Sequence, residues 1–296
     1  MKKTIALILS VLLLLSVMGC GAKEPAKTTA PTATPEVQAT ATPDPEPVET
    51  PEPAPEPVEV IVFAAASMTE TITQIIDLYK EVAPHVTIIP TFDSSGTLKT
   101  QIEEGADCDL FISAAQKQMN ELDISKDETT NPDRLDFVLS GSRLNLLENK
   151  VALVVPEGNS AGINGFEDIA DCEMIAIGNS DVPVGSYTLE ILEYLGLDVA
   201  SMEAAGQITY GSNVKEVTTQ VSEATVSCGV VYATDAFSAG LEVVETATSE
   251  MCRQVIYPAA VLNIAKNAEA AQAFLDFLST PEAVAVFEAV GFSIVG

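Results

Sequence analysis

The sequence is poor in the residues and motifs that usually accompany catalysis. It has one histidine, His85, and a serine nucleophile would need such a base beside it. His85 stands in the loop before a predicted strand, which places it at the opposite end from the serine-bearing turns described below. No glycine-rich phosphate loop, HExxH or GxSxG is present, and no cysteine or histidine spacing suggests a metal site. We therefore expect a protein that is not an enzyme and has no cofactor.

Basic residues are also scarce: 14 Lys and Arg stand against 43 Asp and Glu, for a net charge of −29. Lys2 and Lys3 belong to a leader, and residues 21–57 hold seven acids and two lysines, which leaves −26 on residues 58–296. This charge argues against nucleic acid or an anionic membrane surface as a partner. An anionic ligand would need donors and dipoles close by, because charges beyond about 8 Å are screened at physiological salt.

The first residues predict a secretion signal, residues 1–19. Lys2 and Lys3 precede an apolar run, Ile5–Leu15, that is too short for a comfortable transmembrane span. The small residues before Cys20 resemble a bacterial lipobox, which would make Cys20 the acylated first residue of the mature protein. We expect an extracytoplasmic protein anchored to the cell membrane through a lipid on Cys20.

Residues 20–57 predict a disordered linker behind that anchor. Ten of the 17 prolines lie in residues 21–57, among Thr, Ala and Glu and almost no large apolar side chains. Such a segment cannot bury enough surface to offset its chain entropy. As polyproline II, at about 3.1 Å per residue, it could reach on the order of 110 Å.

Four cysteines remain beyond Cys20: Cys108, Cys172, Cys228 and Cys252. Export permits disulfides, and four cysteines allow three pairings. The first three lie at the edges of apolar strands, where a free thiol packs as a small hydrophobic group. We expect free thiols.

The sequence from residue 60 onward predicts an α/β fold. Strands and helices alternate twice between residues 60 and 113, which favours parallel strands joined by helices. The strands are expected at 60–63, 86–92 and 109–113, and the helices at 68–82 and 97–104. Further strands are expected at 150–156, 174–178, 207–210 and 228–232, and helices at 186–195 and from 214 to about 221.

Ser67 and Ser95 each stand where a strand ends and a helix begins. Helix N-termini carry unpaired N–H groups and the positive end of the helix dipole, so two of them together can bind an anion without a charged side chain. The alternative is that each serine is only a helix cap, and Ser67–Glu70 has the form of a capping box. Ser94 and Ser95 before Gly96 favour a ligand site, because glycine lets the backbone approach it closely.

Three segments in a fixed order resemble the molybdate-binding proteins of ABC importers: Phe-Ala-Ala-Ala-Ser at 63–67, Phe-Asp-Ser-Ser-Gly-Thr-Leu at 92–98, and Gln-Ile-Glu-Glu-Gly-Ala-Asp-Cys-Asp-Leu-Phe-Ile-Ser-Ala at 101–114. The resemblance implies a two-lobe, periplasmic-binding-protein-like fold of type II, with two crossover segments and the ligand in the interlobe cleft. It places lobe one at 58–148 plus 247–296 and lobe two at 149–246. A monomer is expected.

The same resemblance implies the ligand site. Lobe one would supply the hydroxyls of Ser67 and Ser95, and lobe two the hydroxyl of Tyr232 and the backbone N–H groups of Val184 and Val214. Val184 stands where many members of the family carry alanine. Molybdenum would be held as molybdate by these residues.

Three charged residues lie near these motifs. The carboxylate of Asp93 would repel an oxyanion unless it points away. Lys99 and Lys215 could contact the ligand, but we expect them to be solvated helix residues.

Neutral donors suit a fully ionised tetrahedral oxyanion, which only accepts hydrogen bonds. Phosphate keeps a proton near neutral pH, and a site made only of donors leaves that proton unpaired. The resemblance implies binding of molybdate, and of tungstate, outside the cell and delivery to the permease of an ABC transporter. Two alternatives stay open: another oxyanion such as sulfate, and an oxyanion-sensing lobe that docks on a membrane receptor.

Overall fold

The computed structural model describes residues 55–295. The predicted signal, Cys20 and most of the predicted linker lie outside the described residues. Residues 55–57 are exposed and belong to no helix or strand. Within the described part of the chain, no helix is both long enough and apolar enough to cross a membrane.

One sheet has six strands in the order β11-β4-β10-β3-β1-β2. Their bounds are β1 Val58–Ala65, β2 Val86–Asp93, β3 Leu110–Ile112, β4 Leu144–Asn149, β10 Val255–Val261 and β11 Ser293–Ile294. Strand β1 pairs in parallel with β2 and β3, as the two successive β-α units predict. Strand β10 returns from near the C-terminus and lies antiparallel between β3 and β4.

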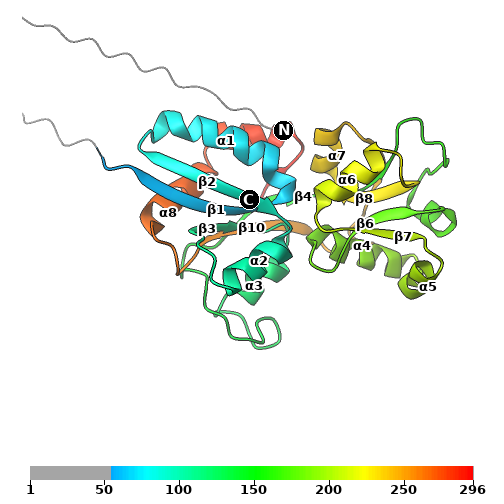
Figure 1. Cartoon of the computed structure of the whole chain (residues 1–296), viewed down its shortest axis with the longest axis horizontal. Coiled ribbons are helices and arrows are strands. Elements are labelled where there is room, and N and C mark those ends of the chain that lie inside the picture. The colour runs from blue at the N-terminus through cyan, green and yellow to red at the C-terminus, as the bar shows by residue number, and fades with distance from the viewer. Residues whose placement is uncertain (1–54, 296) are drawn as a thin grey trace, which may run out of the picture. The chain divides into compact units, whose positions relative to one another are not determined.

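Helices cover both faces of this sheet (Figure 1). They are α1 Thr69–Val82, α2 Ser95–Glu103, α3 Gln116–Glu121, α8 Ala268–Phe277 and α9 Pro281–Ala289. Alternate residues of β1 point to opposite faces, so Val62 packs in the cluster that holds α1, α8 and α9, and Phe63 in the cluster that holds α2 and α3. Ile72, Ile75 and Tyr79 form the buried stripe of α1.

The other sheet has five strands in the order β7-β6-β8-β5-β9. Their bounds are β5 Val151–Val155, β6 Ile175–Gly178, β7 Ile208–Gly211, β8 Cys228–Tyr232 and β9 Glu242–Thr246. Strand β6 pairs in parallel with β7 and β8, and β5 lies antiparallel to β8 and β9. Every residue of β5 and β8 is buried, which explains their unbroken apolar sequences.

The helices that accompany this sheet are α4 Pro183–Tyr194, α5 Val199–Ala204, α6 Val214–Ser222 and α7 Ala233–Ala239. Two short 3₁₀ helices, η1 Ala66–Met68 and η2 Phe166–Asp171, complete the described elements. Helix α5 was not predicted, although Asp198 caps it by accepting the N–H of Ser201 and Gly206 follows it.

The chain crosses between the two sheets twice. It leaves β4 at Asn149 and enters β5 at Val151, and it returns between Thr246 of β9 and Val255 of β10. These two crossings confirm the predicted α/β fold class. The four cysteines of the described residues are free, as expected.

Candidate functional site

A small cavity lies where strand ends and helix starts from both sheets meet. Its volume is about 10 Å³. It is lined by Ala65, Ala66, Ser67, Asp93, Ser94, Ser95, Ala114, Val182, Pro183, Val214 and Tyr232. A cavity of this size holds about one water molecule, so the walls must separate to admit an ion with four oxygens.

Four of the five predicted ligand residues line this cavity, and Val184 does not. Just before α4, the N–H of Val182 donates to the carbonyl of Asn179 at 3.1 Å, an ordinary hydrogen-bond length. Pro183 has no N–H, so Val184 offers the first free N–H group of that helix. Its side chain is buried in the core.

Ser67, Ser95 and Val214 likewise stand in the first turns of η1, α2 and α6. First-turn N–H groups have no acceptor within their own helix, and the helix dipole is positive there. The cavity therefore collects N–H donors from helices that belong to both sheets. No lysine or arginine lines it.

The interpretation of Ser67 as a helix cap is wrong. The N-cap of α1 is Met68, and no side chain caps this helix. The hydroxyl of Ser67 instead lies 2.9 Å from the hydroxyl of Tyr257. Glu70, the partner in a capping box, pairs with Lys215 at 2.8 Å.

Ser95 is not a cap either, because its neighbour has that role. Ser94 is the N-cap of α2, and its Oγ accepts the N–H of Thr97 at 3.1 Å. The Oγ of the fully buried Ser95 accepts the N–H of Ala114 at 2.9 Å. Ala114 was missed as a functional residue, although it ends the third segment of the family resemblance.

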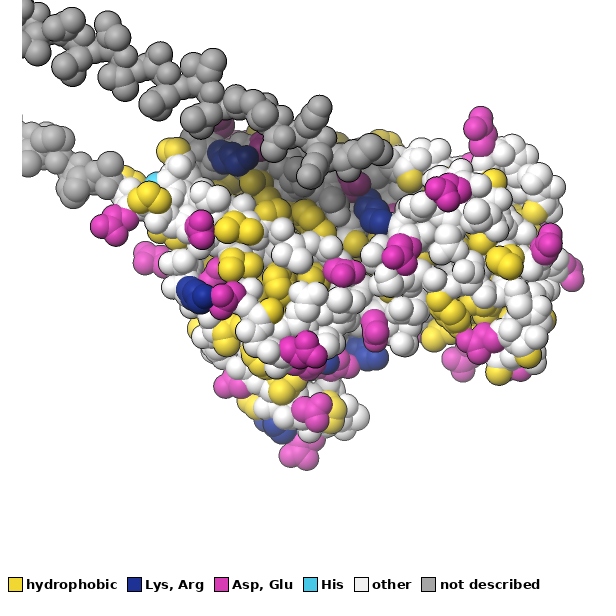
Figure 2. Space-filling model, viewed as in Figure 1, with side chains coloured by type: hydrophobic (Ala, Val, Ile, Leu, Met, Phe, Trp, Pro, Cys, Tyr) yellow, Lys and Arg dark blue, Asp and Glu magenta, His cyan; other side chains and the backbone are white. Residues whose placement is uncertain are grey.

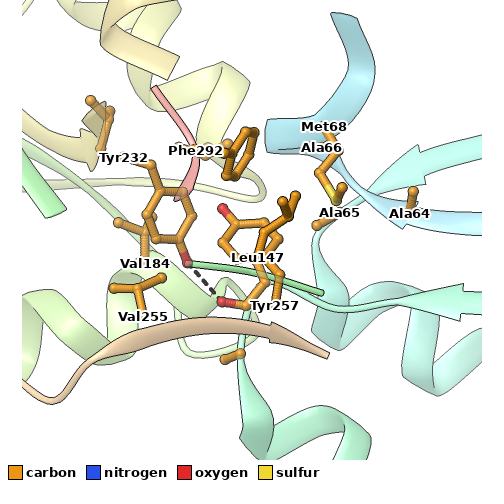
Figure 3. Packing of buried hydrophobic residues seen from close by; sticks show 14 of the residues in the cluster. Ala64, Ala65, Ala66, Met68, Leu147, Val184, Tyr232, Val255, Tyr257 and Phe292 are labelled. Atoms are coloured by element: carbon orange, nitrogen blue, oxygen red, sulfur yellow. Dashed lines mark hydrogen bonds between the residues drawn. The ribbon is translucent and has the colours of Figure 1, made fainter. Parts of the chain in front are cut away.

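Tyr232 is buried and remains protonated. Burial, reinforced by the neighbouring hydroxyls of Tyr257 and Tyr187 and by Asp235, raises the pKa of Tyr232 well above its ordinary value. Its hydroxyl donates to the carbonyl of Ala114 at 3.3 Å, the dashed line in Figure 3. To bind an anion, this O–H must exchange a carbonyl oxygen for an oxygen of the ligand.

The carboxylate of Asp93 stays at the site. Asp93 lines the cavity, and its Oδ1 accepts the N–H of Ser94 at 2.7 Å. One of its oxygens is thus held at the start of α2. Because Asp93 accepts the N–H of Ser94, that N–H group is not available to a ligand in the cavity.

Lys99 and Lys215 are partly exposed helix residues, and both are engaged in ion pairs. Lys99 pairs with Glu103 at 2.8 Å and with Glu121 at 3.2 Å. Lys215 of α6 lies 2.8 Å from Glu70 of α1, an ion pair between helices of different sheets. Neither lysine lines the cavity.

Asp235 of α7 is an unusual buried acid beside Lys215. Its carboxylate is fully buried, and neither oxygen accepts a hydrogen bond. The Nζ of Lys215 lies 3.3 Å from Oδ1, close enough for an ion pair but poorly aligned for a hydrogen bond. Burial raises the pKa of Asp235 to about 6, and Lys215 opposes that rise.

A much larger hollow, about 840 Å³, lies elsewhere, beside α3. Its central cation, Arg143, donates to Asp123 at 2.7 Å and to Gln116 and Asn120 at 2.5 Å each. These bonds engage the guanidinium within the protein, and the hollow is also lined by Lys126 and by the acids Asp123 and Asp136. Among residues 55–295, no group of three His, Cys, Asp or Glu side chains could hold a metal ion.

Acidic side chains are scattered over the face shown in Figure 2, and basic ones are few. No lysine or arginine lines the cavity, so the groups there that can attract an anion are N–H and O–H donors.

Comparison with known proteins identifies the family. The family model of the bacterial extracellular solute-binding proteins matches residues 60–293. The chain is 33% identical to YvgL of Bacillus subtilis strain 168, provisionally named an ABC transporter substrate-binding lipoprotein, over 80% of this chain and 86% of YvgL. It is 32% identical to the molybdate-binding protein ModA of Escherichia coli K12, over 80% of this chain and 89% of ModA.

Among solved structures, the chain resembles the substrate-binding domain of a provisionally assigned molybdenum ABC transporter from Clostridium difficile. The TM-score is 0.60 and the identity 31%, over 81% of this chain and 100% of that domain. The predicted resemblance to molybdate-binding proteins is confirmed.

Proposed function

The chain belongs to the bacterial extracellular solute-binding proteins, and on this basis we propose that it binds molybdate, and also tungstate, outside the cell and delivers it to the permease of an ABC transporter. The similarity to ModA and to the Clostridium difficile domain supports molybdate as the ligand. The protein acts by binding rather than catalysis. A lipid on Cys20 anchors the monomer, and residues 20–57 tether it.

The neutral donors that converge on this cavity, beside the carboxylate of Asp93, are the observation that carries this proposal. Ser67 and Ser95 bind the anion from one side, and Tyr232 with the N–H groups of Val184 and Val214 binds it from the other. All of these groups donate, and molybdate only accepts, so each donor finds a partner. A site of similar affinity built from lysine or arginine side chains would also attract protonated and monovalent anions.

The lobes divide as the family resemblance implies: 58–148 plus 247–296, and 149–246. Because the donors come from both lobes, the bound anion bridges them. An open form leaves the donors in water, whereas the closed form pairs them with one ligand, and this difference in affinity drives closure.

Calorimetric titration of the purified full chain with molybdate, tungstate, sulfate and phosphate tests the proposal. We expect tight binding of molybdate and tungstate and much weaker binding of phosphate. Tighter binding of sulfate than of molybdate would assign the protein to another oxyanion. Absence of binding to all four would refute the oxyanion site.

A further inference from the structure

We propose that Asn149 and Tyr257 are positioning residues that fix the Ser67 hydroxyl as a hydrogen-bond donor to the bound anion. The inference rests on the proposed function, because it concerns the same cavity. Ser67 Oγ and Tyr257 Oη are 2.9 Å apart, and at that distance either hydroxyl could be the donor. The bonds beyond Tyr257 decide between the two directions.

The direction is set first at Asn149, the last residue of β4. Its Oδ1 accepts the backbone N–H of Lys150 at 2.8 Å, and a backbone N–H can only donate. The amide oxygen is therefore on that side and the amide nitrogen on the other. This nitrogen lies 2.8 Å from Thr234 Oγ1 and 3.3 Å from Tyr257 Oη, and it donates to both.

The bond from Asn149 in turn fixes the donor and acceptor roles of the Tyr257 hydroxyl. Its hydroxyl oxygen accepts a hydrogen bond from Asn149, and its own O–H is directed to Ser67 Oγ. Tyr257 is fully buried, and burial raises its pKa well above the ordinary value, so this proton stays in place. The ring packs between those of Tyr232 and Phe292 (Figure 3). Its centroid lies 5.7 Å from that of Tyr232 and 5.2 Å from that of Phe292.

Ser67 consequently accepts one hydrogen bond, from Tyr257. A hydroxyl carries one proton, and the proton of Ser67 remains free for the cavity that Ser67 lines. Ser95 reaches the same state by a shorter route, because the N–H of Ala114 occupies its Oγ. In both serines one lone pair is thus engaged within the protein, and the hydroxyl proton is left for the anion. At these two serines the arrangement favours molybdate, which only accepts hydrogen bonds, over hydrogenphosphate, whereas the carboxylate of Asp93 is a separate acceptor beside the cavity.

The test is a double-mutant cycle on the full chain, with molybdate as the titrant. Tyr257→Phe keeps the ring but lets the Ser67 hydroxyl rotate, and we expect molybdate affinity to fall about three- to tenfold. In a Ser67→Ala background, the same Tyr257→Phe change should have no further effect. A role of Tyr257 in packing alone would lower affinity equally in both backgrounds, and that result would overturn the proposal.

Tyr187→Phe is the matched control. Tyr187 is also buried and belongs to the same row of aromatic rings, with its centroid 6.4 Å from that of Tyr232. Its hydroxyl is not part of the hydrogen-bond relay, by which we mean the chain from Asn149 through Tyr257 to Ser67. Its loss should leave molybdate affinity unchanged. Competition by millimolar hydrogenphosphate gives a second readout: Tyr257→Phe should reduce the preference for molybdate, and Tyr187→Phe should not.

Asn149→Asp reverses the relay with almost no change in shape. A carboxylate cannot donate, so Tyr257 would turn its proton to Asp and draw the proton of Ser67 away from the anion. We expect a larger loss than for Tyr257→Phe, and a smaller loss in the Ser67→Ala background, where only the added charge acts. Equal losses in the two backgrounds would contradict the relay. Failure of the parent to bind molybdate would instead refute the proposed function.

Discussion

The backbone N–H of Gly96 donates to the backbone carbonyl of Asp181 at 3.0 Å. Gly96 belongs to α2, and Asp181 stands in the loop before α4, so this bond joins elements of the two sheets beside the cavity. A Cβ at Gly96 would lie 2.3 Å from that carbonyl oxygen, and a backbone atom cannot move aside as a side chain would. The closed arrangement therefore requires glycine at this position.

Gly96→Ala should separate binding from folding. Alanine is a better helix former than glycine, so α2 itself should be no less stable. Closure over the anion would be blocked by contact with Asp181. We expect unchanged or slightly higher thermal stability without ligand, and a loss of most of the stabilisation that molybdate gives. If molybdate raises the Tm of the variant as much as that of the parent, binding does not require the close contact between Gly96 and Asp181.

Val214→Pro removes a single N–H donor. Proline is well tolerated at the first position of a helix, and Asn213 before it is extended, as a residue before proline prefers to be. We expect a loss of about 1.5–3 kcal/mol in binding free energy, or roughly ten- to a hundredfold in affinity. Val214→Ala keeps the N–H and is the control, with little loss expected. Equal affinities of the two variants would show that the N–H of Val214 does not bind the ligand.

Asp235 should make stability depend on pH in a definite direction. Its pKa in the folded protein is about 6, against an ordinary 3.8. Between these values the folded state keeps a proton that the unfolded chain has lost, so the free energy of unfolding falls as the pH rises from about 4 to about 6. Denaturant unfolding of Asp235→Asn and the parent should show the variant gaining relative stability across this range. A constant difference from pH 4 to pH 8 would show that Asp235 does not titrate there.

Lys215→Gln and Glu70→Gln delete the same ion pair but differ at Asp235. The pair is partly exposed, with side chains 30% and 51% accessible, and is worth about 0–1 kcal/mol. Only Lys215→Gln also removes the cation beside the buried Asp235. We expect Lys215→Gln to be the less stable variant at pH 8, with the difference closing near pH 5, where Asp235 is protonated. The double variant Lys215→Gln/Asp235→Asn should recover the difference.

The elements of the fold were predictable because their signals are local. Apolar runs broken by Ser67 and Ser95 predict strand ends and helix starts, and the buried stripe of α1 follows from its own spacing. The orientation of the serine side chains was not predictable. Ser67 has a capping-box sequence, yet its hydroxyl bonds to Tyr257, which is 190 residues away along the chain.

The same limit applies to the contacts between the two sheets. Nothing near Lys215 in the sequence marks Glu70 or Asp235 as its partners, because α6, α1 and α7 meet only after both sheets have formed. The role of Gly96 as a close contact for Asp181 depends equally on tertiary structure. Resemblance to a family supplied the ligand residues, but not the groups that orient them.

Molybdate titration of Ser67→Ala and Ser95→Ala is the most direct test of an anion site built from neutral donors. Each substitution removes one hydroxyl donor to a charged ligand, and the expected loss is about 1.5–3 kcal/mol, or roughly ten- to a hundredfold in affinity. Ser94→Ala, which removes the cap of α2, is the control for helix stability. If both Ser67→Ala and Ser95→Ala bind molybdate as tightly as the parent, the two hydroxyls do not bind the anion and the assigned site is wrong.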